Sequence, residues 1–190
     1  MVNFIIICMD WGSEKGKATS ATLFVTWNSA LNFGDKMINI IFKCVKPNNP
    51  DIYKLIKSLD QYLLMQYPDR PIFGIDLEKA SQENVHFIVG YNNDQAVCCG
   101  AIRLFNDNRC ELKRMFVLDE YRGKGISKKL YYELENLAIS KNKKIIILET
   151  GKKQSEAINL YKSLGFKIIP NYGEFIKDEI SLCFSKTISE

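Results

Sequence analysis

The sequence predicts a mixed α/β (α+β) domain with a mostly antiparallel central sheet, one parallel βαβ pair and helices on both faces. Three observations lead to this prediction. Short apolar runs separated by turn residues succeed one another between residues 86 and 118, as in an antiparallel meander. A segment with helical periodicity then leads into a continuous apolar run at 145–148, which is typical of a crossover to a buried parallel strand. Two more apolar runs follow a second helical segment.

The first predicted elements are a strand at 38–45 and a helix that ends near Pro68. Asp51 is expected to cap this helix, because an aspartate directly before an apolar stripe is a typical start signal. A short helix is expected at 77–82. The apolar stripe of the first helix consists of Ile52, Leu55, Ile56, Leu59 and Leu63.

A β-hairpin is predicted next, with strands at 86–91 and 96–105 around a turn at 92–94. A second turn at 106–108 leads into a strand at 111–118, which has no Gly or Pro. Strict alternation would place two sets of side chains on opposite faces of this strand. One set is Glu111, Lys113, Met115 and Val117, and the other is Leu112, Arg114, Phe116 and Leu118.

The second half of the domain is predicted to begin with a helix from Ser127, followed by the parallel strand at 145–148. A further helix is expected at 154–164, with Gly165 at its C-terminal cap, and the last strands are expected at 166–169 and 180–186. The apolar face of the helix that begins at Ser127 consists of Leu130, Leu134, Leu137 and Ala138.

At 190 residues the chain is expected to hold one domain. Residues 1–36 show short apolar patches without clear periodicity, and are expected to form a hairpin or a poorly ordered extension of unknown role, outside the functional protein. Residues 37–190 are expected to form the functional domain. Its 46% of apolar and 25% of charged residues are typical of a soluble globular protein.

Charge and cysteine usage argue against several classes of function. The net charge of +4 is modest and basic residues gather around one loop, so no nucleic-acid partner is expected. The six cysteines contain no C-x-x-C spacing and His86 is the single histidine, so neither a zinc site nor a histidine-based catalytic group is expected. Buried, reduced thiols and the lack of a recognisable signal or membrane-spanning segment predict a cytoplasmic location without a membrane partner.

The loop Arg122–Ser127 reads Arg-Gly-Lys-Gly-Ile-Ser and joins the strand at 111–118 to a helix. Its glycines permit positive φ, and the first N–H groups of a helix have no intrahelical acceptor. With the positive end of the helix dipole and nearby basic side chains, this pattern favours a pyrophosphate site. A basic turn without a ligand is the alternative. The nucleotide-binding loop does not fit, because it needs Gly, four residues and then Gly-Lys-Ser/Thr. The dinucleotide fingerprint does not fit either, because Lys128 stands where it needs a third glycine.

From about Met37 onward the chain resembles the GNAT superfamily of acetyl-CoA-dependent N-acetyltransferases. The loop Arg122–Ser127 is similar to the family's pyrophosphate motif Gln/Arg-x-x-Gly-x-Gly/Ala. Residues 154–166 are similar to its later motif Asn-x-x-Ala-x-x-Leu-Tyr-x-x-x-Gly-Phe. This sequence departs from the two motifs at Ser127, where the family has Gly or Ala, and at Gln154, where it has Asn.

The resemblance implies a GNAT-like fold, with the parallel pair at the cofactor cleft, and acetyl-CoA as the acetyl donor, without a metal. It also implies which residues bind the donor: the pantetheine arm lies along one strand, the pyrophosphate in the loop, and further contacts come from the later helix. These residues are Met115, Phe116 and Val117; Arg122, Gly123, Lys124, Gly125, Ile126 and Ser127; and Gln154 and Asn159.

The resemblance further implies Tyr161 as the general acid that protonates the thiolate leaving group, and Glu111 as the base that activates the amine. Glu149 is a second candidate for the base. A strand glutamate of purely structural role and a core aromatic are the alternative interpretations of Glu111 and Tyr161.

The expected partner is a small-molecule amine acceptor, and the chain is expected to be a monomer or a homodimer. Acetylation of protein N-termini or lysines, and a catalytically idle acyl-CoA-binding domain, are alternatives. A narrow, charged pocket around Tyr172 and Glu174 would favour the small-molecule acceptor.

Overall fold

The computed structural model describes residues 38–188, so the predictions for residues 1–36 lie outside the described residues. The strands are β1 (Ile40–Val45), β2 (Val85–Asn92), β3 (Gln95–Leu104), β4 (Arg109–Val117), β5 (Ile145–Gly151), β6 (Lys167–Ile169) and β7 (Ser181–Thr187). The helices are α1 (Pro50–Gln66), α2 (Ile126–Ser140) and α3 (Ser155–Ser163), and short 3-10 turns occur at Asp119–Tyr121 and Gly173–Phe175.

The seven strands form one sheet in the order β1-β2-β3-β4-β5-β7-β6. All neighbouring strands are antiparallel except β4 and β5, which are parallel and joined through α2. The predicted meander, parallel βαβ pair and two C-terminal strands are therefore confirmed. Gly165 has a φ of +88° directly after α3, as expected of a C-terminal cap.

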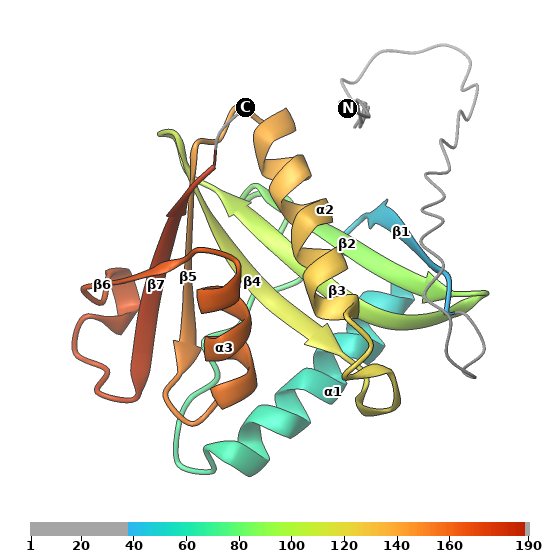
Figure 1. The fold of residues 1–190 in the computed structure, drawn as a ribbon, viewed down its shortest axis with the longest axis horizontal. Coiled ribbons are helices and arrows are strands. Elements are labelled where there is room, and N and C mark those ends of the chain that lie inside the picture. The colour runs from blue at the N-terminus through green and yellow to red at the C-terminus, as the bar shows by residue number, and fades with distance from the viewer. Residues whose placement is uncertain (1–37, 189–190) are drawn as a thin grey trace.

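Helices cover both faces of the sheet, as predicted (Figure 1). On one face, α1 packs on side chains from β2, β3 and β4, among them Phe87, Val89 and Phe116. On the other face, α2 and α3 pack on a larger cluster that includes Leu112 and Phe184. The central strands β3 and β4 are therefore buried on both faces, and packing on both sides holds any site at their ends in place.

Two local predictions in the first half of the domain are wrong. Helix α1 begins at Pro50 and is capped by Asn49, not by Asp51. Pro50 has no N–H, so the first helical N–H that needs an acceptor is that of Asp51, and it donates to the side-chain oxygen of Asn49 at 2.8 Å. The helix expected at 77–82 is instead a series of turns, one of them closed by Asp76, whose carboxylate accepts from Glu78 N at 3.0 Å. A side chain that bonds the backbone two residues ahead competes with helix formation.

The strict alternation predicted for residues 111–118 is also wrong, because β4 contains a bulge. Between the pairs Ala101↔Lys113 and Cys99↔Phe116, β3 has one residue and β4 has two. The bulged residue Arg114 has a φ of +57°. From Met115 onward the side chains therefore lie on the face opposite to the predicted one: Met115 packs in the α2 cluster and Phe116 in the α1 cluster.

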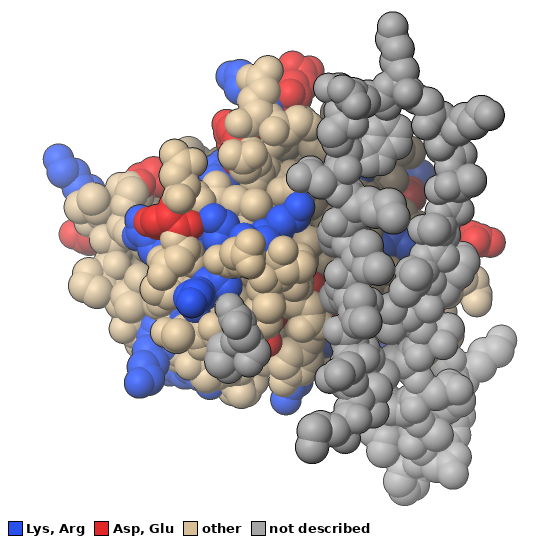
Figure 2. All heavy atoms as spheres, turned by 90° about the horizontal axis from the view of Figure 1, so that it is seen from above, with Lys and Arg blue, Asp and Glu red and all other residues tan. Residues whose placement is uncertain are grey.

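Four cysteines of the described part are buried free thiols, as predicted: Cys98, Cys99, Cys110 and Cys183; Cys44 is exposed. Basic residues are not confined to the loop at 122–127, since three lysines follow α2 at its other end. Figure 2 views the molecule from that end and shows Lys and Arg side chains across it in blue. Within residues 38–188, no helix is long and apolar enough to cross a membrane.

Candidate active site

The sheet opens between β4 and β5. The two parallel strands pair only from Arg109↔Ile145 to Leu112↔Leu148, and beyond this point each continues without the other. A cavity of about 510 Å³ lies at the opening and is lined by residues of α1, β4, β5, α3 and the loop after β4. The edge of β4 that faces β5 is unpaired from Lys113 to Val117, so it can receive an added extended chain.

The loop between β4 and α2 lies at one end of this cavity. Gly123 and Gly125 have φ values of +72° and +73°, and a Cβ at either position would meet no atom within 4 Å, so their outer side is open. Within residues 38–188, no backbone hydrogen bond is donated by the N–H groups from Gly123 to Lys128. These open N–H groups at the start of α2 fit the pyrophosphate of a coenzyme A thioester.

Glu111 lies on β4 at the other end of the cavity and is almost completely buried, with 3% exposure. Both of its carboxylate oxygens have partners. Oε1 accepts from the Tyr172 hydroxyl at 3.0 Å and lies 3.3 Å from Lys113 Nζ, and Oε2 lies 3.7 Å from Arg103 Nη1. The carboxylate is therefore held in place by three groups from three parts of the chain.

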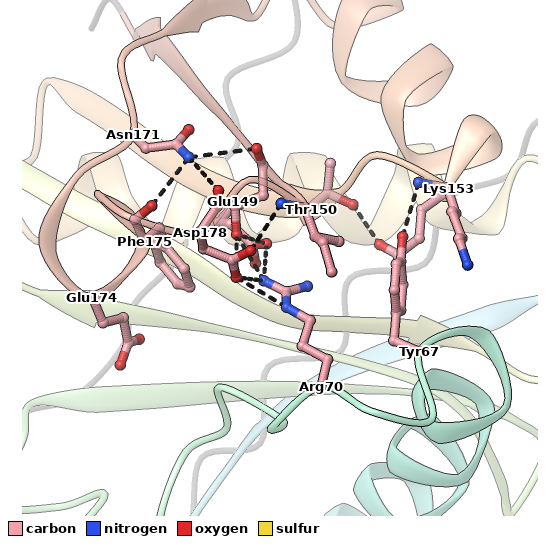
Figure 3. A network of polar contacts seen from close by, with 12 residues as sticks. Tyr67, Arg70, Glu149, Thr150, Lys153, Asn171, Glu174, Phe175 and Asp178 are labelled. Atoms are coloured by element: carbon pink, nitrogen blue, oxygen red, sulfur yellow. Dashed lines mark hydrogen bonds and ion pairs between the residues drawn. The ribbon is translucent and has the colours of Figure 1, made fainter.

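Glu149 lies near the end of β5, next to the opening, and also lines the cavity. Its Oε1 accepts from Ser181 Oγ at 2.6 Å and from Arg70 Nη2 at 3.0 Å. No hydrogen bond from a described residue reaches its Oε2. Figure 3 shows Arg70 reaching from the segment after α1 toward Glu149 and Asp178. Glu149 therefore has one fixed oxygen and one available oxygen.

Arg70 connects three segments through this network. Its Nε and Nη2 both donate to Asp178 Oδ2, at 3.0 and 2.6 Å, besides the contact with Glu149. Burial alone would raise the pKa of the Asp178 carboxyl, but the N–H of Ile180 and the Arg70 guanidinium outweigh it and hold that pKa below its ordinary value. Asp178 is therefore ionised at neutral pH, and the ion pair keeps the segment after α1 against β5 and β7.

Tyr161 lies on α3, where its ring packs against Phe166 and Phe184 while the residue lines the cavity. It is 7% exposed, so it is a core aromatic and a cavity residue at once. Burial raises the pKa of its phenol, and the negative charge of Glu149 raises it further. Tyr161 therefore keeps its proton at neutral pH and can donate it.

The cavity brings together nine of the thirteen residues predicted for the site, and four do not line it. Lys124 and Gly125 are exposed in the loop, Ile126 is buried under it, and Asn159 is exposed on α3. The nine are Glu111, Met115, Phe116, Val117, Arg122, Gly123, Ser127, Gln154 and Tyr161.

Two of the side chains that were predicted to bind the donor are bonded to other groups of the protein. Arg122 donates from Nε to the carbonyl of Val117 at 3.1 Å, pairs with Asp119 at 2.9 Å, and lies over the ring of Tyr62. The side-chain oxygen of Gln154 accepts a hydrogen bond from the Thr150 hydroxyl. Their contacts with the donor remain predictions.

Sequence reasoning missed several residues that line the cavity, among them Tyr67, Arg70, Lys113, Arg114 and Phe175. Tyr67 and Arg70 flank Pro68 in an irregular segment, where no periodicity indicates orientation. Arg114 reaches the cavity because of the bulge, which alternation alone cannot reveal. Tyr172 and Glu174, around which the acceptor pocket was predicted, do not line this cavity; they contact its lining residues Glu111 and Lys113, at 3.0 and 3.5 Å.

Comparisons with known proteins agree with this geometry. The model of the Acetyltransferase (GNAT) family matches residues 49–166. The chain is 31% identical to the IAA acetyltransferase of Azospirillum brasilense over 153 residues, which are 80% of this chain and all of that protein.

Solved structures show the same fold. A Klebsiella pneumoniae protein assigned to the acyl-CoA N-acyltransferases has a TM-score of 0.66 at 25% identity, over 78% of this chain and 97% of that one. A GNAT family acetyltransferase of Elizabethkingia anophelis with acetyl-CoA bound has a TM-score of 0.59 at 17% identity, over 78% and 98%. Sequence, fold and cavity thus lead to one conclusion: the chain belongs to the GNAT family and is an acyltransferase that uses an acyl-CoA donor.

Proposed function

We propose that this enzyme transfers the acetyl group of acetyl-CoA to a primary amine of a small molecule, by direct attack within a ternary complex. The observation that carries the proposal is the continuity of the open N–H groups at Gly123–Lys128 with a cavity that is lined by Tyr161, Glu111 and Glu149. The loop holds the pyrophosphate. The unpaired edge of β4 at Met115–Val117 bonds the pantetheine amides as a neighbouring strand would, which directs the thioester into the opening.

The amine needs a base. A primary amine with a pKa of about 10 is neutral in about one molecule in a thousand at pH 7, so a proton must be removed before attack. Glu149 is better suited to receive it than Glu111, because Oε2 of Glu149 is available while both oxygens of Glu111 are occupied. Glu111 then orders the acceptor end of the cavity through Tyr172 and Lys113.

The leaving thiolate needs a proton, and the Tyr161 phenol, which lines the cavity and is protonated at neutral pH, supplies it. The carbonyl oxygen gains negative charge during attack. Backbone N–H groups on the unpaired edge of β4, near Val117, stabilise this charge. Glu149 thus receives the amine proton, and Tyr161 gives a proton to sulfur.

Contacts between two segments at the acceptor end of the cavity support a small acceptor over a protein chain. Arg70 and Phe73 of the segment after α1 lie against Asp178 and Phe175, with ring centroids of the two phenylalanines 5.3 Å apart. This contact between the two segments limits the width of the entrance. A protein lysine or N-terminus would need room for the chain that carries it.

Calorimetric titration of acetyl-CoA into the full chain tests the donor site. Gly125→Asp places bulk and negative charge among the open N–H groups and abolishes binding. Gly165→Asp is the matched control, because Gly165 has a similar φ, +88° against +73°, and equally open surroundings, but follows α3 and is not part of the loop with the open N–H groups. Retained affinity in Gly125→Asp would refute the placement.

Release of the coenzyme A thiol in the presence of a broad panel of amines tests the transfer itself. Release that depends on a small amine is the expected result. Binding of acetyl-CoA without release for any amine would favour the catalytically idle domain, and release only with peptides would favour a protein acetyltransferase.

We also propose that the acetyltransferase domain comprises residues 37–190. The family match begins at residue 49, and β1 begins at Ile40. A shortened chain beginning at Met37 is expected to bind acetyl-CoA with the affinity of the full chain. A loss of binding would show that earlier residues belong to the site.

A further inference from the structure

The bulge of β4 places two consecutive basic side chains on the same face of the sheet. Lys113 precedes the bulge and contacts Glu111 and Glu174, while Arg114 contacts Asp60 of α1. Arg114 adopts a φ of +57°, a left-handed conformation that costs free energy for any residue with a Cβ. Such conformations are found where a functional side chain has to be directed.

The guanidinium of Arg114 is buried, with 7% of its side chain exposed, and is incompletely bonded. Its Nη1 donates to Asp60 Oδ1 at 2.6 Å. Its Nε has no hydrogen-bond partner among the described residues, and Nη2 has none there either. Nη2 occupies the space that a Cβ at Gly74 would need. The Nε and Nη2 groups form one side of the planar fork that binds a carboxylate with two hydrogen bonds.

Arg114 contacts fewer carboxylates than the other basic residues at the acceptor end of the cavity. Arg70 contacts two carboxylates, Glu149 and Asp178, and Lys113 also contacts two. Arg114 contacts only Asp60, which is itself one-third exposed. A buried, partly bonded guanidinium is stabilised when an anionic group completes its bonds.

We propose that Arg114 binds a carboxylate of the acceptor, so that the acceptor is an amino acid or a related amine that carries a carboxylate. This inference rests on the proposed function. Because Nε is buried and Nη2 lies against Gly74, the side chain has to turn toward the cavity to receive the carboxylate on its Nε and Nη2 side. The amine of the same molecule then lies toward Glu149. A simple amine leaves the guanidinium incompletely bonded.

The experiment measures kcat/KM of the full chain for the common α-amino acids, each compared with its carboxamide. The two members of a pair differ in the carboxylate and in the pKa of the amine, which is lower in the amide, so kcat/KM is compared per molecule of neutral amine. Because a charge-assisted, two-bond contact is lost in the amide, the acid is expected to exceed the amide about 100-fold. An equal rate for both members of every pair would overturn the proposal.

Arg114→Met removes the fork and keeps an unbranched side chain of similar reach, so the acid-to-amide ratio is expected to fall to about one. Asp60→Asn together with Arg114→Met removes the carboxylate that the single change leaves unpaired, and gives the same ratio. Arg109→Met is the control: Arg109 pairs with the exposed Asp107 and does not line the cavity, and its change keeps the ratio. A persistent ratio in Arg114→Met would contradict the proposal.

Failure of the proposed function has a different signature. If acetyl-CoA binds but no acceptor releases coenzyme A, calorimetric titration of the same acids and amides into the protein saturated with coenzyme A decides the question. Binding of an acid, lost in its amide and in Arg114→Met, supports the carboxylate site without transfer. Absence of binding by all acids overturns the inference.

Discussion

The hydroxyl group of Tyr67, directly after α1, accepts a hydrogen bond from the backbone N–H of Lys153 at 2.9 Å. This bond connects the segment after α1 to the turn between β5 and α3, across the opening of the sheet. The space beside it is filled, because a Cβ at Gly151 would overlap the Tyr67 hydroxyl. Tyr67 therefore fixes the width of the cavity from one side, as Arg70 does a few residues later.

Tyr67→Phe is expected to lower the free energy of unfolding by about 1 kcal/mol, because the Lys153 N–H loses its partner. Gly151→Ala is expected to cost about 1–3 kcal/mol, since the added methyl group overlaps the Tyr67 ring. Urea unfolding measures both. In a Tyr67→Ala background the cost of Gly151→Ala should largely disappear; an undiminished cost would show that another neighbour is overpacked.

Tyr161→Phe is expected to lower kcat about 100-fold, at the low end of the range for general acids because a thiolate is a good leaving group. The affinity for acetyl-CoA should stay the same, since the ring still packs against Phe166 and Phe184. Steady-state release of coenzyme A and calorimetric titration measure the two effects. Tyr132→Phe, on the exposed side of α2, is the control. A normal kcat in Tyr161→Phe would remove this phenol from the mechanism.

Glu149→Gln is expected to lower kcat/KM for the acceptor about 100-fold, because the amide keeps the Ser181 contact but cannot take up a proton. The Arg70–Asp178 pair remains and should hold the segment in place. Glu111→Gln is expected to act mainly on the acceptor KM, through Tyr172. Initial rates across pH 6 to 9 separate the two variants. The reverse pattern would assign the base to Glu111.

Tyr91 gives a test of stability at alkaline pH. Burial, followed by the hydrogen bond to Asp51, raises the pKa of Tyr91 to about 12 from an ordinary value of 10.0. Below pH 10 the phenol is protonated in the folded and the unfolded chain, so its contribution to the free energy of unfolding is fully present there. Between pH 10 and 12 only the unfolded chain releases the proton, and this contribution to stability is lost.

Each pH unit in that window should therefore lower the free energy of unfolding by about 1.4 kcal/mol through Tyr91 alone. Tyr91→Phe removes this part of the slope, although it loses the bond to Asp51 at neutral pH. Urea unfolding at a series of pH values from 9 to 12 measures it. The same slope in the variant and the parent chain would show that other groups carry the alkaline loss.

The two failed predictions in the first half of the domain, the helix cap and the helix at 77–82, share a physical cause. Both Asn49 and Asp76 accept hydrogen bonds from backbone N–H groups two residues ahead, at 2.8 and 3.0 Å. A short side chain with a carbonyl oxygen can start a helix or close a turn with the same bond. Which outcome follows depends on the packing of the next residues: Ile52 after Asn49 is fully buried, whereas Glu78 and Lys79 after Asp76 are exposed.

Sequence patterns alone determined the order of strands and helices, the parallel β4–β5 pair and the open loop at Gly123 and Gly125, because these follow from local periodicity and backbone freedom. They also determined the GNAT resemblance. The tertiary structure decided which charged side chains line the cavity. The bulge that turns Arg114 toward Asp60, and the irregular segment that carries Arg70 to Glu149, depend on contacts between residues more than fifty positions apart, which periodicity does not encode.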